Sequence, residues 1–556
     1  MKKFKKVLAI ALVMTMALAM LAACGPDTPA PAGDGGAEPT GGTQQGSGGS
    51  LVDEVAQPGE VTIVDVAPEG EDVRFADEID IIYDMNIIAV LNAFLPGSTA
   101  PPHRMAFTLM YDTLLDPPLV LGDPWRPRLA TSWETEDYQR FIFNLRDDVY
   151  FQNGEHFTAY DVVFTVQMAH ENVGTMAHTS WRGVETITPL DDYTLEIILD
   201  EVDVDFLHLL SLPGAHVINE VALEADPVEG IWVGTGSYIL TEFHASDFIV
   251  LEANPNYWGT PPRTQRLILR HVPEASARTM MLQNDQVQVC LSITPADKPL
   301  FENDPENFSV FPWVLTSPNF LTFNFTDPIT GCWYFRRAVA HIVDPVAMAR
   351  VANGDWAFPW EHGTIWGFGT EFMNYDIPLI PYDPDIARSY LERSVWNGET
   401  VRLHAAHVNN IRAIEFLQEE FRQIGVPVDI ITSDVAGLAS VATYHNNESQ
   451  MVLHVGTLTD SASSIRNFLL PGSATNRSSY NNPRVLELLT LASGTTDRAE
   501  REAIYREIQE IAAADVAYIC VYMIIQAAVT VNGVGGMILR SDNNNDFRGI
   551  YRVIQD

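Results

Sequence analysis

Residues 129–165 have the sequence LATSWETEDYQRFIFNLRDDVYFQNGEHFTAYDVVFT, and this stretch predicts a strand-turn-helix unit. Phe141, Phe143 and Leu145 alternate with more polar neighbours, which is the period of a half-buried strand. Val149 and Phe151 repeat that period after a short break. We therefore expect a strand followed by a second, shorter one.

The rest of the stretch predicts a tight turn and a capped helix. Asn153-Gly154 favours a turn, because both residue types tolerate positive φ. Thr158 has the character of a helix N-cap, with Asp161 three residues on as the short form of a capping box. An apolar helix face follows at Val162, Val163 and Val166.

The order and spacing of these motifs resemble the family 5 extracytoplasmic solute-binding proteins, the peptide- and nickel-binding receptors of ABC importers. SWE, FxFxLR and VxFxxGxxFTAxDVVFT all match the family pattern. In that family the unit is structural and lies away from the ligand, which implies that its acids are solvated or capping groups. Further matches follow along the chain: MYDTLL at 110–115, GTGSY at 234–238, LEANPNYWG at 251–259, CWYFRRAVAHIVD at 332–344, YDPDIA at 382–387 and SYNNP at 479–483.

The N-terminus has the pattern of a lipoprotein export signal. Lysines 2, 3, 5 and 6 precede an apolar run over 7–23 that is too short for a comfortable membrane span. The run ends in Leu-Ala-Ala-Cys24, which matches the bacterial lipobox, and we expect a lipid on Cys24. The alternative is an ordinary signal peptide with an incidental cysteine. Residues 24–59 are rich in Gly, Pro, Ala, Thr and Ser and are expected to form a disordered tether.

Length and charge set the broad class. A chain of 556 residues is expected to form at least two lobes, because single cores stop growing near ~250–300 residues. It carries 73 acidic and 33 basic residues, a net charge of −40. Such a surface repels nucleic acid, so no nucleic-acid partner is expected, and it is compatible with cationic ligands.

The sequence offers no catalytic motif. It contains no G-x-S-x-G elbow and no H-E-x-x-H pair, so we expect no enzyme, no cofactor and no metal site. The cysteines after the lipobox are Cys290, Cys332 and Cys520. Buried free thiols are the default for them, and one disulfide is possible in an exported protein.

The region over 400–460 predicts where a ligand binds. Val401 and Leu403 indicate a strand, residues 411–424 carry a helical apolar face, and residues 426–431 indicate a second strand. This β-α-β pattern predicts a parallel sheet, joined by a third strand over 451–455. Since ligands of open α/β sheets bind outside the carboxyl ends of the strands, the loops 404–410 and 456–466 are expected at the ligand crevice.

The family resemblance implies roles for single residues in those loops. In the peptide receptors an Asp after the third strand pairs with the peptide α-ammonium, and Asp460 is the carboxylate available here. The local motif departs from the family pattern, because Thr457 replaces a Trp and no Asp-Pro follows. A capping or solvated Asp460 is the alternative.

Two histidines occupy the region in which the dipeptide receptor carries a carboxylate-binding Arg. They are His404 and His407, so the fixed clamp for a dipeptide C-terminus is missing. This argues against strict dipeptide specificity and leaves longer peptides, other amines or a metal complex. The two histidines are alternatively metal ligands, although a His pair without further ligands is weak evidence.

Two further positions are candidates for the ligand cleft. Asn324 ends the strand FLTFN, which in the family lies near the first crossover between lobes. Trp366 belongs to an aromatic-rich loop over 353–372, which either lines a pocket or packs as a loop.

The resemblance implies an α/β two-lobe periplasmic-binding-protein fold with an extra small subdomain in the first lobe and the ligand cleft between the lobes. The expected boundaries are a signal peptide at 1–23, the tether at 24–59, lobe I at 60–324, lobe II at 325–528 and a return to lobe I at 529–556. The implied function is that of a monomeric lipoprotein of an ABC importer, anchored outside the cell membrane. It would capture peptides by hinge closure and deliver them to the permease and its ATPase subunits. A nickel or metal-chelate receptor on the same fold is the alternative.

Overall fold

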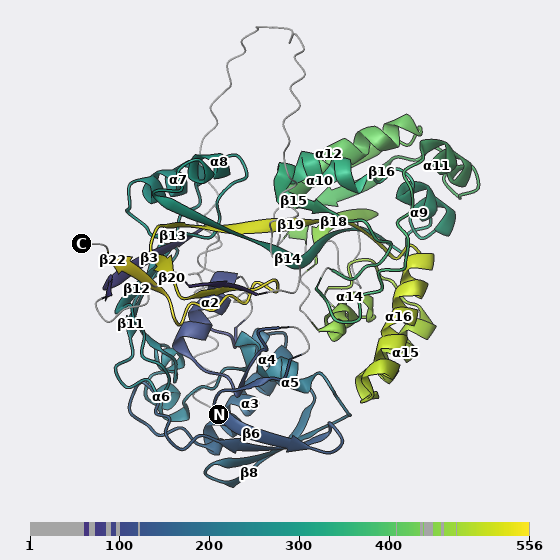
Figure 1. Ribbon diagram of the computed structural model, residues 1–556. Coiled ribbons are helices and arrows are strands. Elements are labelled where there is room, and N and C mark those ends of the chain that lie inside the picture. Colours follow the sequence, from purple (N-terminus) through teal and green to yellow (C-terminus); the bar gives the residue numbers. More distant parts are fainter. Residues whose placement is uncertain are drawn as a thin grey trace.

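A computed structural model describes residues 61–65, 73–84, 91–95, 101–120, 123–367, 369–406, 408–433, 437–438, 449–456, 461–473 and 475–554. Cys24 lies outside these residues. Within them, no helix is both long and apolar enough to span a membrane. The described chain forms two α/β lobes joined by a pair of long strands (Figure 1).

The main sheet has eleven strands and continues through both lobes. Its path is β10-β11-β12-β3-β13-β19-β14-β18-β16-β17, and β15 pairs with β19 beside that path. The lobe I strands are β3 (Glu78–Tyr83), β10 (Tyr238–His244), β11 (Phe248–Ala253), β12 (Arg266–His271) and β13 (Val289–Cys290). The lobe II strands are β15 (Ala357–Pro359), β16 (Val401–Ala405), β17 (Val428–Thr432) and β18 (Met451–Val455).

The two lobes are connected by β14 (Phe308–Phe323) and β19 (Tyr518–Val531), which pair antiparallel along their length. Both are seen crossing the middle of the molecule in Figure 1. Their register shifts between Val314 and Pro318, and this shift separates the lobe I core around Trp313 from the lobe II core around Leu321. The crossover therefore lies inside the strands, ahead of the expected boundaries at 324 and 529.

The stretch over 129–165 lies in a subdomain of lobe I, and its predicted first strand, turn and capped helix are confirmed. The predicted second, shorter strand over 149–151 is not formed, because only an isolated bridge joins Tyr150 to His156. Strands β6 (Ala130–Thr135), β7 (Arg140–Leu145), β8 (Val184–Asp191) and β9 (Thr194–Leu199) make a four-stranded sheet in the order β6-β7-β9-β8. Gly154 has φ +89° at the predicted turn. Helix α3 (Ala159–Glu171) starts at Thr158, and Asp161 closes the capping box by accepting from the Thr158 backbone N–H at 2.9 Å. Helices α4 (Met176–Trp181) and α5 (Phe206–Leu210) complete the subdomain.

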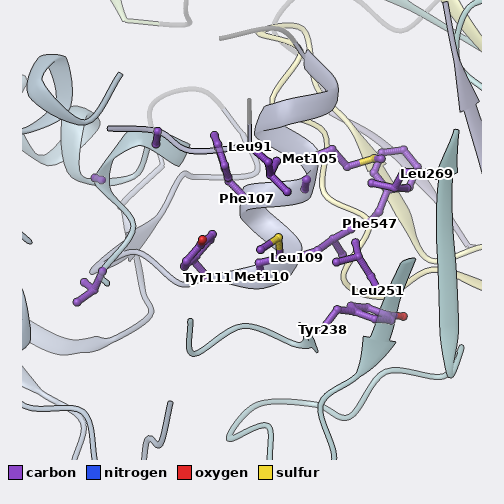
Figure 2. Packing of buried hydrophobic residues seen from close by; sticks show 14 of the residues in the cluster. Leu91, Met105, Phe107, Leu109, Met110, Tyr111, Tyr238, Leu251, Leu269 and Phe547 are labelled. Carbon is purple, nitrogen blue, oxygen red and sulfur yellow. The ribbon is translucent and has the colours of Figure 1, made fainter. Parts of the chain in front are cut away.

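Helix α2 (Pro101–Met110) lies at the centre of the lobe I core. Its apolar side chains and Tyr111 pack with Leu91, Tyr238, Leu251, Leu269 and Phe547 (Figure 2). Around this core lie α6 (Glu220–Ala225), α7 (Ala275–Gln283), α8 (Lys298–Glu302) and the short strands β1 (Thr62–Val64), β2 (Arg74–Phe75), β4 (Leu115–Asp116), β5 (Arg126–Pro127), β20 (Val534–Gly535), β21 (Met537–Leu539) and β22 (Tyr551–Ile554). The segment that follows β19 thus returns to lobe I.

Lobe II has helices on both faces of its part of the sheet (Figure 1). One face carries α9 (Trp333–Ala340), α10 (Pro345–Asn353), α11 (Pro384–Leu391) and α12 (Val408–Gln423). The other carries α14 (Arg466–Leu469), α15 (Pro483–Gly494) and α16 (Arg498–Ala514). The predicted β-α-β unit is confirmed, because β16 is parallel to both β17 and β18.

The three cysteines in the described part of the chain are free thiols. Cys290 and Cys520 are buried, and Cys332 is half-buried. The possible disulfide among them is therefore not formed.

Candidate functional site

The candidate site lies at the crossover in β14, where the two lobes meet. The strand irregularity brings Thr316 to the lobe I segment that follows β21, where its backbone N–H donates to Ser541 O at 2.8 Å and its hydroxyl donates to the same oxygen at 3.1 Å. On the other side, Gly367 lies so close that a Cβ atom there would be 2.6 Å from Thr316 O. The crossover is thus held between parts of both lobes.

The carboxyl ends of the lobe II parallel strands reach this crossover. Val455, the last residue of β18, pairs with Asn319. Gly456 then donates its N–H to Pro318 O at 2.8 Å and lies against the ring of Phe320. The segment after β18 therefore begins beside the crossover, and its role at a ligand crevice stays a prediction.

The start of α12 is fixed in the same area. Asn410 accepts a hydrogen bond from the Tyr522 hydroxyl of β19 at 2.5 Å, and its amide donates to Leu453 O at 3.5 Å. Both predicted crevice loops therefore leave the sheet at the end where the two lobes meet, which is where ligands of open α/β sheets bind.

The β18 loop also contacts lobe I. Ser461 donates its hydroxyl to Asp205 Oδ1, at the start of α5, over 3.1 Å. Nearby, the Val204 N–H donates to Ser493 O of α15 at 3.4 Å. The loop that begins at the hinge thus ends in a contact between the two lobes.

Charged side chains gather around this contact. Burial and then the neighbouring charge of Asp205 raise the pKa of the Asp203 carboxyl. Burial lowers the pKa of the nearby Arg182 guanidinium, although Asp203 and Asp205 act in the opposite direction. From lobe II, Arg466 donates to the Ser493 hydroxyl at 2.6 Å. The charges at this contact are therefore mixed, because the Arg182 and Arg466 guanidinium groups lower the pKa of Asp203 against the effect of its burial.

A second group of charges, in lobe I, is already paired. Arg548 binds Asp546 at 2.5 Å and Asp116 at 3.1 Å, and Arg128 adds an ion pair to Asp112. Burial by itself would raise the pKa of Asp546, but the Arg548 guanidinium lowers it to about 2. The pocket beside these pairs holds only about 40 Å³, enough for water rather than a peptide.

His404 and Asn324 both have structural partners. The two ring nitrogens of His404 lie 3.0 Å from the hydroxyls of Ser449 and Ser433, and burial lowers the pKa of His404.

Asn324 follows Phe323, which pairs with the first residue of β18. Asn324 therefore lies at the end of the sheet that is remote from the crossover. Its side chain accepts from the Thr326 N–H at 2.9 Å. The expectation that Asn324 lies near the hinge is corrected accordingly.

Trp366 is buried in the lobe II core against Tyr505, and its indole Nε1 has no hydrogen-bond partner among the described residues. Its neighbour Gly367 contacts the crossover, so the aromatic loop packs next to the hinge.

Asp460 and His407 lie outside the described residues. Their ligand roles stay predictions.

The sequence argument missed Asp203 and Asp205. These acids occur in the run VDVDF, which carries no binding motif, and Asp205 is 256 positions from Ser461 in the chain. Only the fold brings them to the β18 loop.

A family model and several characterised proteins match this chain. Residues 125–478 match the model of the bacterial extracellular solute-binding proteins, family 5 Middle. Heme-binding protein A of Haemophilus influenzae is 25% identical over 429 residues, which is 69% of this chain and 76% of that protein. Glutathione-binding protein GsiB of Pectobacterium atrosepticum is 25% identical over 411 residues, covering 70% and 79% of the two chains.

Solved structures show the same fold. The substrate-binding protein CtaP of Listeria monocytogenes has a TM-score of 0.76 at 19% identity and covers 86% of this chain and all of its own. DppA of Helicobacter pylori in complex with the peptide STSA has a TM-score of 0.73 at 20% identity, with 86% and 98% covered. NikZ of Campylobacter jejuni in complex with Ni(L-His) has a TM-score of 0.69 at 20% identity, with 83% and 95% covered.

The two-lobe α/β fold predicted from the sequence is thereby confirmed. Its crossover, its parallel strands ending at the lobe contact and its family match lead to one conclusion. The chain belongs to family 5 of the bacterial extracellular solute-binding proteins, which bind substrates for ABC transporters and are not enzymes.

Proposed function

We propose that this chain is the peptide-capturing lipoprotein of an ABC importer, and that it takes oligopeptides rather than strict dipeptides. Ligand binding between the lobes favours the closed state, which the permease recognises. The proposal is supported by two contacts on either side of residues 457–460: Gly456 donates to Pro318 O at the crossover, and Ser461 donates to Asp205 in lobe I. A ligand held by this loop is in position to bridge both lobes.

Asp460 is our candidate for the peptide α-ammonium, because it directly precedes Ser461. A carboxylate and an ammonium form a charge-assisted hydrogen bond that strengthens as water is excluded.

The preference for longer peptides rests on His404. Its ring is engaged by two hydroxyls, and it occupies the region in which the dipeptide receptor carries an Arg. A longer peptide is held along its backbone by strand-like hydrogen bonds, which do not require a clamp at a fixed distance. His407 and Trp366 remain candidates for contacts with side chains of the ligand.

The first test identifies what the protein carries. Native mass spectrometry of the soluble protein that begins after Cys24, purified without chelator, is followed by denaturation and mass analysis of released ligands. We expect a series of peptide masses longer than dipeptides. A bound nickel ion or metal chelate would replace the peptide proposal by the metal-chelate alternative.

The second test concerns Asp460. Calorimetry compares tri-alanine with N-acetyl-tri-alanine on the wild type and on Asp460→Ala. We expect the substitution to weaken tri-alanine binding by about tenfold or more, since one charge-assisted bond is lost. Asp429→Ala, an exposed acid on β17, is the matched control. Equal affinity of wild type and Asp460→Ala for tri-alanine would refute this assignment.

Membrane attachment through Cys24 is tested separately. We expect fractionation of cells to find the wild type with the membrane and Cys24→Ser in the soluble fraction. Retention of Cys24→Ser at the membrane would remove the lipid-anchor proposal without affecting peptide capture.

A further inference from the structure

Lobe II contains a cavity that is separate from the space between the lobes. It has a volume of about 550 Å³, which is the size of a small-molecule site. All of its lining residues belong to lobe II: they come from α9 and Val343 beyond it, from His362 and Gly363, from the segment 374–381, from the C-terminal part of α16 and from residues 516–520. None of them takes part in the Asp205–Ser461 contact or in the crossover.

The cavity is lined by one cation without a counter-ion. Arg337 of α9 has no ion-pair partner among the described residues, and its Nε atom is buried without a hydrogen-bond acceptor. The adjacent Arg336, by contrast, donates to the backbone oxygens of Asp515 and Gly331. A buried N–H without an acceptor costs free energy, so an anionic oxygen that accepts from the Arg337 guanidinium would stabilise this side chain.

The cavity is also lined by one anion without a counter-ion. Glu510 of α16 contacts the amide of Asn374 at 3.4 Å but forms no ion pair within the described chain. The other lining acid, Asp376, is paired with Arg506. One unpaired positive and one unpaired negative side chain thus face the same cavity.

The remaining wall is mostly apolar, with side chains such as Ala340, Val343, Ile377, Leu379 and Ile519. We propose that this lobe II cavity is a second binding site, for a small zwitterion with an apolar body. The chemical class that fits is a free α-amino acid with an aliphatic side chain. Its carboxylate binds Arg337, its ammonium binds Glu510, and its side chain lies on the apolar wall.

L-Leucine is the probe, and binding to the whole soluble protein is followed by calorimetry. We expect leucine to bind, and leucinamide and N-acetyl-leucine to bind at least about tenfold more weakly, because each lacks one of the two charges. Arg337→Gln and Glu510→Gln should each weaken leucine binding by about tenfold. The matched controls Arg484→Gln and Glu507→Gln remove an exposed ion pair of lobe II outside the cavity and should leave leucine binding unchanged.

Tri-alanine binding separates this site from the one between the lobes. We expect Arg337→Gln to leave tri-alanine affinity unchanged and saturating tri-alanine to leave leucine affinity unchanged. Competition between the two ligands, absence of leucine binding at millimolar concentration, or equal leucine affinity in wild type and both cavity variants would each overturn the second site. Thermal unfolding of the variants establishes that they are folded, and loss of tri-alanine binding alone would count against the peptide proposal only.

Discussion

The Lys298 ammonium lies 3.7 Å from the centroid of the Trp356 ring, which joins α8 of lobe I to the segment before β15 of lobe II. Lys298 is 3% exposed and also pairs with Glu302 at 2.7 Å. A buried cation over an indole face is a favourable contact, so this pair stabilises the packing of the lobes beside the crossover.

Replacing Lys298 by Gln should lower the free energy of unfolding by about 1 kcal/mol, because the cation–π contact is lost. Urea unfolding of Lys298→Gln, Trp356→Leu and the double variant measures the coupling between the two residues. Glu302→Gln leaves the buried Lys298 ammonium without its carboxylate partner, so it should also destabilise the protein, and only the coupling to Trp356 isolates the ring contact. Strict additivity of the two single substitutions would contradict the contact.

Gly367→Ala should disturb the crossover, because the added Cβ would lie 2.6 Å from Thr316 O and 3.2 Å from Pro318 Cδ. We expect a loss of about 1–3 kcal/mol in stability, the usual cost of overpacking, together with weaker peptide binding. Gly494→Ala at the end of α15 is the matched control, since no atom lies within 4 Å of its added Cβ. If both substitutions had equal effects in thermal unfolding and calorimetry, close packing at the crossover would not be the cause.

Acid should destabilise the protein through His208 and His216. Burial lowers the pKa of each to about 4, so both are neutral in the folded state; His216 donates from Nδ1 to Pro213 O at 2.7 Å. In the unfolded chain a histidine takes up its proton near pH ~6.5. The unfolded state therefore binds more protons between pH ~6.5 and 4, and stability falls as the pH falls through that window.

The free energy of unfolding should fall by about 3 kcal/mol per histidine once the pH lies below both the unfolded and the folded pKa. Urea unfolding at several pH values should show a shallower slope for His208→Gln or His216→Gln than for the wild type, and a still shallower one for the double variant. A slope that is identical in all four proteins would show that other groups control the acid response.

Thiol labelling should distinguish the cysteines of the folded body. Burial raises the pKa of Cys290 to about 11 and that of Cys520 well above its usual value. Since the thiolate is the reactive form, brief iodoacetamide treatment at pH 8 should modify the half-buried Cys332 and leave the other two unmodified. Peptide mapping measures this, with the urea-unfolded protein as the fully labelled control. Rapid labelling of native Cys520 would contradict its buried position.

The local elements could be predicted because their signals are short-range. The Thr158–Asp161 capping box lies within one helical turn, and the β-α-β unit over 401–432 follows from strand and helix periods. The position of the crossover could not. Residues 308–323 form one largely buried strand, and the short polar run 316–319, which includes Pro318, shows a local irregularity without showing that the strand passes there from one core to the other.

The candidate site was predictable only from the lobe II side. Strand ends such as Val455 identify the loops that leave the sheet at the cleft. Asp205 could not be found in the same way, because its contact with Ser461 depends on how two distant segments pack. The sequence does not predict the charges in the lobe II cavity for the same reason, because Arg337 and Glu510 lie on helices that are far apart in the chain.

The pairing of β14 with β19 has a consequence for chain topology. The chain enters lobe II at Pro318 and leaves it at Met523, and these two residues are partners in the same ladder. Lobe II is therefore an insert in lobe I whose two ends lie side by side. A rotation of the insert twists a two-stranded ribbon and barely changes the separation of those ends. The lobes can thus open and close without any connecting segment having to lengthen.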